Sequence, residues 1–338
     1  MAQSSDEIIK REIIDTLGHK HGEIKLRIFP ESSRDDQMLF ADGGLTFGVN
    51  GVSYGSCDAC WYMDEEWKDG FNNVIVDKKP FIALEGTDAL NRKSSGNAQY
   101  QRFHHALGAV KSGVIGVYYL KKGIEKIQPD LFGMAYNASK VEKGEYLIID
   151  DLSVVKDLLQ LSGDKEKLNE YIEKYKQKMF DIFNEKFKST YGSDWNVFAE
   201  KRSTIIKKDY IIKYAGRSRR NFTDSSQRAG HIAVGEMFLT KYYFYNKKFY
   251  YLFPKMTQSD LEDLDKNKGT DKEWFLLRNE DSVEIKTSDD IEGLDQNIKE
   301  ALLSIKDEPL KGEVLGIYND CIKDITQKLN TGEYTIKI

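Results

Sequence analysis

The sequence predicts an α/β protein with a mixed central sheet, and three observations support that class. Apolar, strand-like runs alternate with segments of helical spacing through the first half of the chain. A hydrophobic content of 40% with 31% charged residues is typical of a soluble globular protein. A length of 338 residues is enough for one large core or two ordinary ones.

The first half begins with a helix and then alternates between strands and helices. Residues 5–17 place isoleucines at helical spacing behind Ser5, a suitable N-cap. The glycine-rich residues 42–56 are expected to be irregular. The other predicted elements are strands at 23–29, 56–63, 74–87, 113–120 and 145–151 and helices at 98–110, 152–161 and 164–190.

Beyond residue 195 the pattern becomes β-rich. The predicted strands are 204–216, 242–253, 273–277, 282–287 and 334–338, and the predicted helices are 294–305 and 309–330. We expect a core over residues 1–160 and, over 161–338, a helical linker, a β-rich recognition portion and C-terminal helices. A single integrated domain is the alternative.

Composition excludes several classes of protein. No apolar run approaches the 18 residues of a membrane span, and the polar, acidic start of the chain is unlike a secretory signal. Three cysteines are too few for a disulfide scaffold, so a reducing cytoplasm is the expected location. The net charge of −5 argues against a general nucleic-acid coat, although its distribution is uneven.

Two acids stand at the ends of neighbouring predicted strands. Asp58 opens one apolar run, and Glu85 closes the run of residues 81–84. Hard divalent cations prefer carboxylate oxygens, and phosphodiester hydrolysis uses such a cation to activate water. Thr87 projects from the same strand face as Glu85 because side chains alternate along a strand. These residues predict a metal site.

The stretch from Tyr54 to Leu120 resembles the PD-(D/E)XK nucleases. That superfamily has an acid at a strand start, a hairpin, a strand ending in acid-x-Lys, a helix and another strand. The resemblance implies a restriction-endonuclease-like α/β/α core that cleaves DNA with Mg2+. By this resemblance Asp58, Glu85 and the carbonyl of Gly86 bind the metal ion.

The sequence departs from the family pattern at two positions. Cys57, not proline, precedes Asp58, and Thr87 stands where the family has lysine. Thr87 itself, Lys93 from the following loop, or Gln99 or Gln101 from the next helix would then orient the attacking water. Two further alternatives are Asp77 as the first acid, although only seven residues separate it from Glu85, and an approach of Glu7 or Glu12 to the metal.

Two other segments have the composition of DNA contacts. Gln99, Arg102 and His105 follow one another at helical spacing. This stretch resembles restriction endonucleases, several of which carry a similar Gly…Gln-Arg-Phe stretch after the second acid. Between residues 201 and 228 nine bases accompany only two acids. The predicted DNA-reading residues of this basic segment are Arg217, Arg219, Arg220, Asn221, Gln227 and Arg228. A solvated basic loop is the alternative.

The resemblance implies a sequence-specific, Mg2+-dependent endonuclease for double-stranded DNA, as in type II restriction enzymes. Two-fold symmetric target sites would call for a homodimer. Two alternatives remain open. One is a nucleic-acid-binding protein with an inactive nuclease-like core, which the missing lysine favours. The other is a module that binds a carbohydrate or a protein partner, which the acidic net charge and the 19 tyrosines favour.

Overall fold

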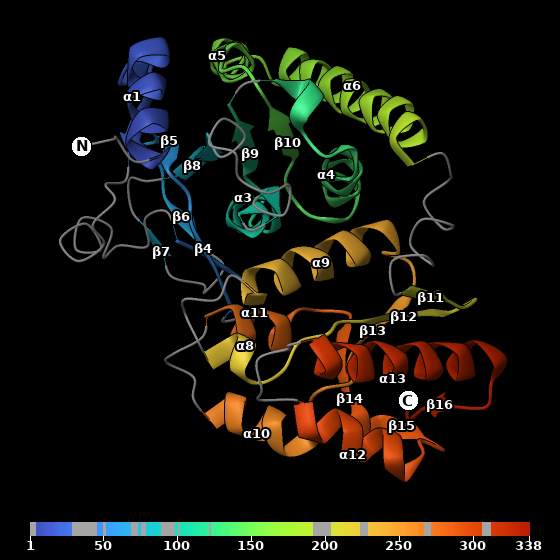
Figure 1. Cartoon of the computed structure of the whole chain (residues 1–338). Helices are drawn as coiled ribbons and strands as arrows, with labels where there is room; N and C mark the ends of the chain where they lie inside the picture. Colours follow the sequence, from blue (N-terminus) through green and yellow to red (C-terminus); the bar gives the residue numbers. More distant parts are fainter. Residues whose placement is uncertain are drawn as a thin grey trace. The chain divides into compact units, whose positions relative to one another are not determined.

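The chain forms two compact units in a computed structural model, Met1–Thr190 and Tyr191–Ile338, here called the N-terminal and C-terminal units (Figure 1). The structure describes residues 5–28, 46–49, 52–68, 74–75, 79–88, 99–100, 102–121, 123–191, 204–223, 229–266, 272–305 and 312–338. The unit boundary follows the long helix α6 (Lys165–Tyr191), whereas the sequence pattern favours a break before that helix. The helix belongs to the N-terminal unit because the Tyr175 hydroxyl donates to the Ile148 carbonyl at 3.0 Å.

A six-stranded sheet is the centre of the N-terminal unit. Its order is β1 (Lys20–His21), β2 (Ile24–Ile28), β5 (Ala59–Met63), β8 (Lys79–Thr87), β9 (Ile115–Leu120) and β10 (Tyr146–Ile149). The β1–β2, β2–β5 and β5–β8 pairs are antiparallel, while the β8–β9 and β9–β10 pairs are parallel. The predicted α/β class with a mixed sheet is therefore confirmed.

Helices cover both faces of this sheet at β8 and β9. A Cβ atom on Gly86 would lie 2.5 Å from Ile9 of α1 (Ser5–Leu17). A Cβ atom on Gly116 would lie 2.5 Å from the Ala106 carbonyl of α3 (Phe103–Lys111). Gly116 is in register with Ala83 in the parallel β8–β9 pair, three residues before Gly86, so the two glycines point to opposite faces. Glycine at these two positions therefore leaves room for α1 on one face of the sheet and for α3 on the other.

The remaining elements complete the N-terminal unit. Residues 46–56 contain a hairpin of β3 (Thr46–Val49) and β4 (Val52–Ser56), so the expectation of irregular structure there was wrong. The hairpin forms because Phe47, Val52 and Tyr54 are buried. The other elements are β6 (Trp67–Lys68), β7 (Val74–Ile75), η3 (Ile124–Lys126), α4 (Pro129–Val141) and α5 (Ser153–Gln160).

The C-terminal unit is built on a four-stranded sheet. Its order is β11 (Thr204–Ile206), β12 (Tyr210–Tyr214), β13 (Lys248–Phe253) and β14 (Val283–Thr287). The last three strands are parallel, which requires crossover connections between them. Helices α8 (Arg220–Thr223) and α9 (Ala229–Tyr243) follow β12, and α10 (Gln258–Lys266) and α11 (Lys272–Asn279) follow β13.

The predicted strand at 273–277 was wrong, and that at 242–253 was too long at its start. The first lies in α11, where Trp274 and Leu277 are buried one helical turn apart and the Trp274 indole donates to Asp265 at 3.0 Å. The second begins at Lys248, because α9 continues to Tyr243. A short apolar run has no periodicity that separates a strand from a buried helix.

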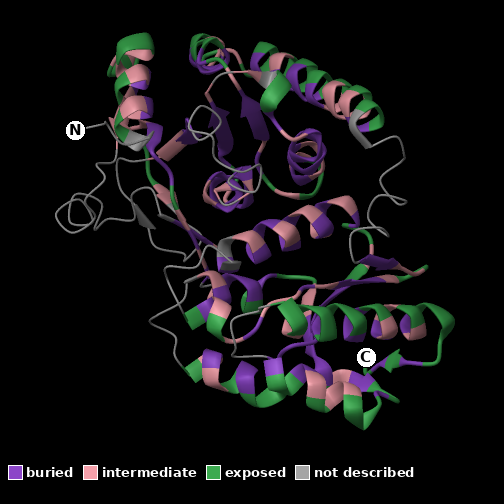
Figure 2. Cartoon of the chain, viewed as in Figure 1, coloured by how far each residue is buried: buried purple, intermediate pink, exposed green. Residues whose placement is uncertain are grey.

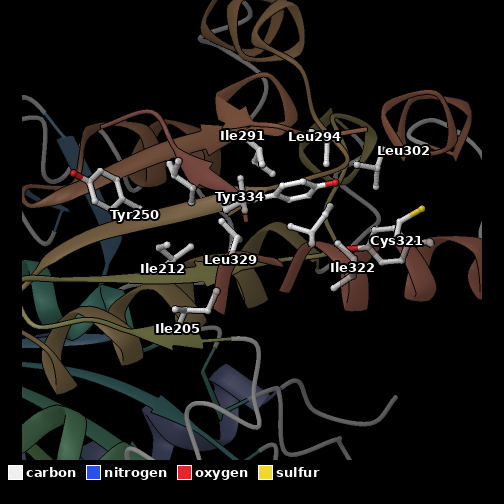
Figure 3. Close-up of a cluster of buried hydrophobic side chains, with 14 of the residues drawn as sticks. Ile205, Ile212, Tyr250, Ile291, Leu294, Leu302, Cys321, Ile322, Leu329 and Tyr334 are labelled. Carbon is white, nitrogen blue, oxygen red and sulfur yellow. The ribbon is translucent and has the colours of Figure 1, made fainter. Parts of the chain in front are cut away.

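The C-terminal unit ends in helices and a small sheet that share one core. The elements are η4 (Ser288–Asp290), β15 (Ile291–Glu292), α12 (Gln296–Ile305), α13 (Gly312–Thr331) and β16 (Thr335–Ile336). Figure 2 shows that buried residues line the inner sides of the helices, with exposed ones outside. Figure 3 shows the hydrophobic cluster to which Ile212, Tyr250, Leu302 and Ile322 belong. Among the described helices, none is both long and apolar enough to cross a lipid bilayer.

Candidate functional site

The strand register brings Asp58 and Glu85 to the same end of the sheet. Ala59 of β5 pairs with Leu84 of β8 in the antiparallel ladder. Asp58 precedes the first of these residues and Glu85 follows the second, so the two acids stand at opposite positions of neighbouring strands. Their exposed fractions are 7% and 2%. Two carboxylates are therefore buried together where β5 begins.

Asp58 is held by the β8 backbone and faces a lysine. Its Oδ2 atom accepts a hydrogen bond from the Gly86 amide at 2.9 Å, which ties the acid to the residue after Glu85. Its Oδ1 atom lies 4.0 Å from the Lys10 ammonium of α1. The side chains of Lys10 and Asp58 are only 12% and 9% exposed, so the attraction acts in a partly desolvated place.

Glu85 faces two basic side chains from the start of α3. The Arg102 Nη1 atom lies 3.1 Å from Oε1, and the His105 Nδ1 atom lies 3.2 Å from Oε2. The same Arg102 nitrogen donates to the Gly86 carbonyl at 3.5 Å. The spacing of three residues puts Arg102 and His105 on one side of the helical turn. Both groups thus lie against the second acid.

The β4 backbone fixes the position of the His105 ring. Gly55 has a φ of +93°, a conformation that L side chains rarely adopt. A Cβ atom at Gly55 would lie 2.6 Å from Cδ2 of His105. The hairpin therefore needs glycine there for its backbone angle and for the close approach of the imidazole to Glu85.

The residues predicted to orient water lie in different surroundings. Thr87 is 4% exposed and ends β8 two positions beyond Glu85. The Gln99 amide nitrogen donates to the Lys126 carbonyl at 3.2 Å, and its oxygen accepts from the Gln128 amide at 2.9 Å. Both ends of this buried amide are engaged in holding the segment before α4. Lys93, Gln101 and Asp77 lie outside the described residues.

Lys10 is the residue that sequence reasoning missed. The sequence pointed to Glu7 and Glu12 on the same helix, but the Glu12 carboxylate is 2.6 Å from the Lys121 ammonium. Glu7 is exposed. Nothing in the spacing of α1 distinguishes Lys10 from other lysines. Its position follows from the packing of Ile9 against Gly86, which is a contact between residues far apart in the sequence.

Cys57 precedes Asp58 and is a buried thiol. Burial, followed by the nearby Glu85 charge, raises the pKa of this thiol well above its usual value. It stays protonated, and its Sγ atom donates to the His105 carbonyl at 3.5 Å. Cys57, Cys60 and Cys321 are all free and buried. A role as a thiolate nucleophile does not fit this environment.

The donor set fits Mg2+ in its chemistry. Asp58 and Glu85 offer carboxylate oxygens and Gly86 a carbonyl oxygen, which are the ligands that hard divalent cations prefer. Among the described residues, no group of three or more histidine, cysteine or acidic side chains is arranged to hold a metal ion. Basic side chains face both acids: Lys10 faces Asp58, and Arg102 and His105 face Glu85.

The predicted DNA-reading residues lie in the C-terminal unit. Arg219 approaches Asp260 at 3.8 Å and Asp263 at 3.3 Å. The Asn221 side-chain oxygen accepts from the Ser218 amide at 2.8 Å, so it shapes the turn. Arg220 is exposed, Arg217 is partly buried, and Gln227 and Arg228 lie outside the described residues. Among the described arginines of this loop, Arg220 is the most exposed.

No family model matches the chain, and neither a curated protein nor a solved structure matches it.

Proposed function

We propose that this protein is a Mg2+-dependent endonuclease that cleaves double-stranded DNA at specific sequences. The strand register that puts Asp58 and Glu85 at one sheet end carries this proposal. The order of β5, β8, α3 and β9 agrees with a restriction-endonuclease-like core. Recognition of two-fold symmetric sites would involve a homodimer.

In this proposal Asp58, Glu85 and the Gly86 carbonyl hold Mg2+. A metal ion bound there lowers the pKa of a water molecule and stabilises charge on the phosphate. Arg102 is about one-third exposed and contacts both Glu85 and Gly86. Its planar fork suits a phosphate oxygen once the metal ion neutralises Glu85.

Lys10 takes the place of the missing family lysine in this proposal. Thr87 carries no charge, and Gln99 is engaged by backbone groups. Lys10 presents an ammonium group 4.0 Å from the first acid. A cation in that position can orient the attacking water or balance charge that develops on the phosphate.

A DNA-binding protein with an inactive core is the second candidate. Both Glu85 oxygens face basic groups, at 3.1 Å and 3.2 Å. A metal ion has to compete with Arg102 and His105 for this carboxylate. If Arg102 and His105 keep Glu85, the unit has a nuclease-like fold but binds no metal ion. A partner- or carbohydrate-binding module is the third candidate, and an absence of DNA binding would favour it.

Cleavage of phage DNA tests the proposal. The wild-type chain is incubated with DNA and either Mg2+ or EDTA, beside Asp58→Asn and Glu85→Gln. We expect discrete fragments only from the wild type with Mg2+. Asp130→Asn is the matched control, because Asp130 of α4 is similarly buried and accepts from the Tyr100 hydroxyl, and asparagine keeps an acceptor.

The other outcomes separate the three candidates. Salt-sensitive DNA retention without cleavage would favour the inactive binding protein. If the protein neither cleaves nor retains DNA, the nucleic-acid proposal is overturned. Cleavage that persists in Glu85→Gln would refute the site even if the protein is a nuclease.

A further inference from the structure

A buried lysine and a partly buried arginine lie near each other at the carboxyl end of the second sheet. Lys255 follows β13 in a tight turn and is 4% exposed. Arg217 follows β12 by three residues, and its Nε atom is buried. β12 and β13 are parallel neighbours, so the segments that leave their carboxyl ends emerge at the same edge. Ligands bind at this edge in many α/β proteins.

Neither cation has a carboxylate partner among the described residues. The Nε atom of Arg217 has no hydrogen-bond acceptor, and no described acid lies within 4.0 Å of either cationic group. The neighbouring buried lysine of this sheet differs: Lys286 of β14 is 2.6 Å from the Glu284 carboxylate. Buried charges in proteins are ordinarily paired, so the unpaired cations call for an explanation.

Groups from α13 and from the segment after β12 lie near Lys255. The Lys255 ammonium lies 4.8 Å from the centre of the Tyr318 ring of α13, which belongs to the core cluster of Figure 3. The nearby Arg217 charge and burial both oppose protonation, and burial is the larger cause. They lower the pKa of Lys255 to about 8. On the α9 side, Glu236 accepts from the Tyr251 hydroxyl at 3.2 Å.

A ring and a hydroxyl do not neutralise two positive charges. A cation–π contact stabilises a cation less than a full counter-charge does. The Tyr318 hydroxyl reaches the same place, because a Cβ atom on Gly216 would lie 2.5 Å from it. The absence of a side chain at Gly216 thus brings Tyr318 close to the strand end that carries Arg217. Two cations and one neutral donor gather there, and no acid among the described residues lies in ion-pair range of either cation.

We propose that Arg217, Lys255 and Tyr318 form a binding site for a phosphate group. A phosphate offers negative charge and several acceptor oxygens to the guanidinium, ammonium and hydroxyl donors. The site lies within the C-terminal unit and does not depend on the proposed nuclease activity. The phosphate belongs either to a free phosphate or phosphomonoester or to the DNA backbone.

Calorimetric titration with inorganic phosphate tests the site on the full-length protein. The comparison is sodium chloride at equal ionic strength, at pH 7 and without phosphate in the starting buffer. We expect saturable binding of phosphate to the wild type and about tenfold weaker binding, or none, to Lys255→Met. That loss corresponds to one charge-assisted hydrogen bond. Lys286→Met is the matched control, because Lys286 has its own carboxylate, and its phosphate affinity should equal that of the wild type.

A second measurement needs no variant. The Lys255 ammonium is followed by nuclear magnetic resonance during a pH titration, with chloride and then with phosphate. Bound phosphate should raise the pKa of Lys255 from about 8 towards its ordinary value of 10.5. No saturable phosphate binding and no change in this titration would overturn the proposal. Equal phosphate affinity in Lys255→Met would also overturn it.

A short DNA duplex in competition identifies the source of the phosphate. Displacement of inorganic phosphate by the duplex would assign the site to the DNA backbone. Binding of phosphate that persists beside a saturating duplex would assign it to a free phosphate or phosphomonoester. A failure of the nuclease proposal appears in the DNA cleavage assay and leaves the phosphate titration unaffected, so the two failures are distinguishable.

Discussion

The two units bury charge in opposite ways. In the N-terminal unit Asp58 and Glu85 are buried acids, and basic side chains from α1 and α3 face both of them. In the C-terminal unit Lys255 is buried and Arg217 is partly buried with a buried Nε atom, and no described acid lies in ion-pair range of either. Acids that have internal partners can fold without a ligand, but they must exchange those partners to bind a cation. Bases without partners depend on water or an anion from outside.

Neutralising Glu85 should have the largest effect. Glu85→Gln retains the side-chain shape but removes the charge that would hold the metal ion. We expect the rate of Mg2+-dependent DNA cleavage to fall by about a hundredfold to a thousandfold, the scale of losing one strong electrostatic contact in an active site. Cleavage by wild type, Glu85→Gln and Asp130→Asn under one set of conditions checks this. A loss in the Asp130 control equal to that in Glu85→Gln would attribute the effect to folding.

Lys10 should have the second largest effect. Lys10→Met should lower the cleavage rate by about tenfold to a hundredfold, because general acid–base and charge-balancing groups contribute on that scale. Lys10→Arg should recover part of the rate, because it keeps a cation. The pH dependence of kcat distinguishes the two roles. Replacement of a lysine that has only a structural role would leave this pH profile unchanged. An unchanged profile in Lys10→Met would remove Lys10 from the mechanism.

Lys255 should affect stability in a way that depends on pH. An unfolded lysine keeps its proton up to its ordinary pKa of 10.5, whereas folded Lys255 releases it near 8. Between these values the unfolded state holds more protons, so Lys255 makes the free energy of unfolding rise with pH. Below pH 8 the full penalty for burying the charge is present, about 3 kcal/mol for a pKa lowered from 10.5 to about 8.

Urea unfolding without phosphate checks this sign. Lys255→Met should be more stable than the wild type at pH 7, and the difference should shrink as the pH rises from 8 to 10.5. Lys286→Met should show no such gain, because it removes a lysine that has a carboxylate partner. A Lys255→Met variant less stable than the wild type at pH 7 would show that a counter-charge is already present.

The smallest expected effect comes from Arg219. Its guanidinium pairs with Asp260 and Asp263, but the Arg219 side chain is 39% exposed and that of Asp263 is 46% exposed. Arg219→Gln should therefore lower the free energy of unfolding by about 1 kcal/mol or less, with a smaller effect at high salt. Urea unfolding at low and high salt checks this. A much larger loss would mean that the loop depends on this ion pair.

The acid pair was predictable because its cause is local. Alternation along two strands and an acid at the end of each run are visible in the sequence, and the register confirms that Asp58 and Glu85 stand opposite each other. The position of Lys10 was not predictable, because it follows from the docking of α1 on Gly86. The engagement of Gln99 was hidden for the same reason, since its partners lie at residues 126 and 128.

The second half was harder to predict because its apolar runs are short. The run at 273–277 has as many apolar residues as a strand, and only its packing as α11 determines the helix. Because β12, β13 and β14 are parallel, helical crossovers must connect them. The predicted succession of strands did not include these helices. The neighbouring positions of Arg217 and Lys255 follow from the parallel pairing of β12 and β13.

Binding of a divalent cation tests the central claim most directly. Calorimetric titration with Mg2+ is carried out on the wild type and on Glu85→Gln, each with and without a short DNA duplex. We predict one saturable site in the wild type, at least about tenfold weaker in the variant, because a ligand charge is lost. Equal affinity in both proteins, or no binding by the wild type under either condition, would contradict the claim that Asp58 and Glu85 exchange their internal cations for Mg2+.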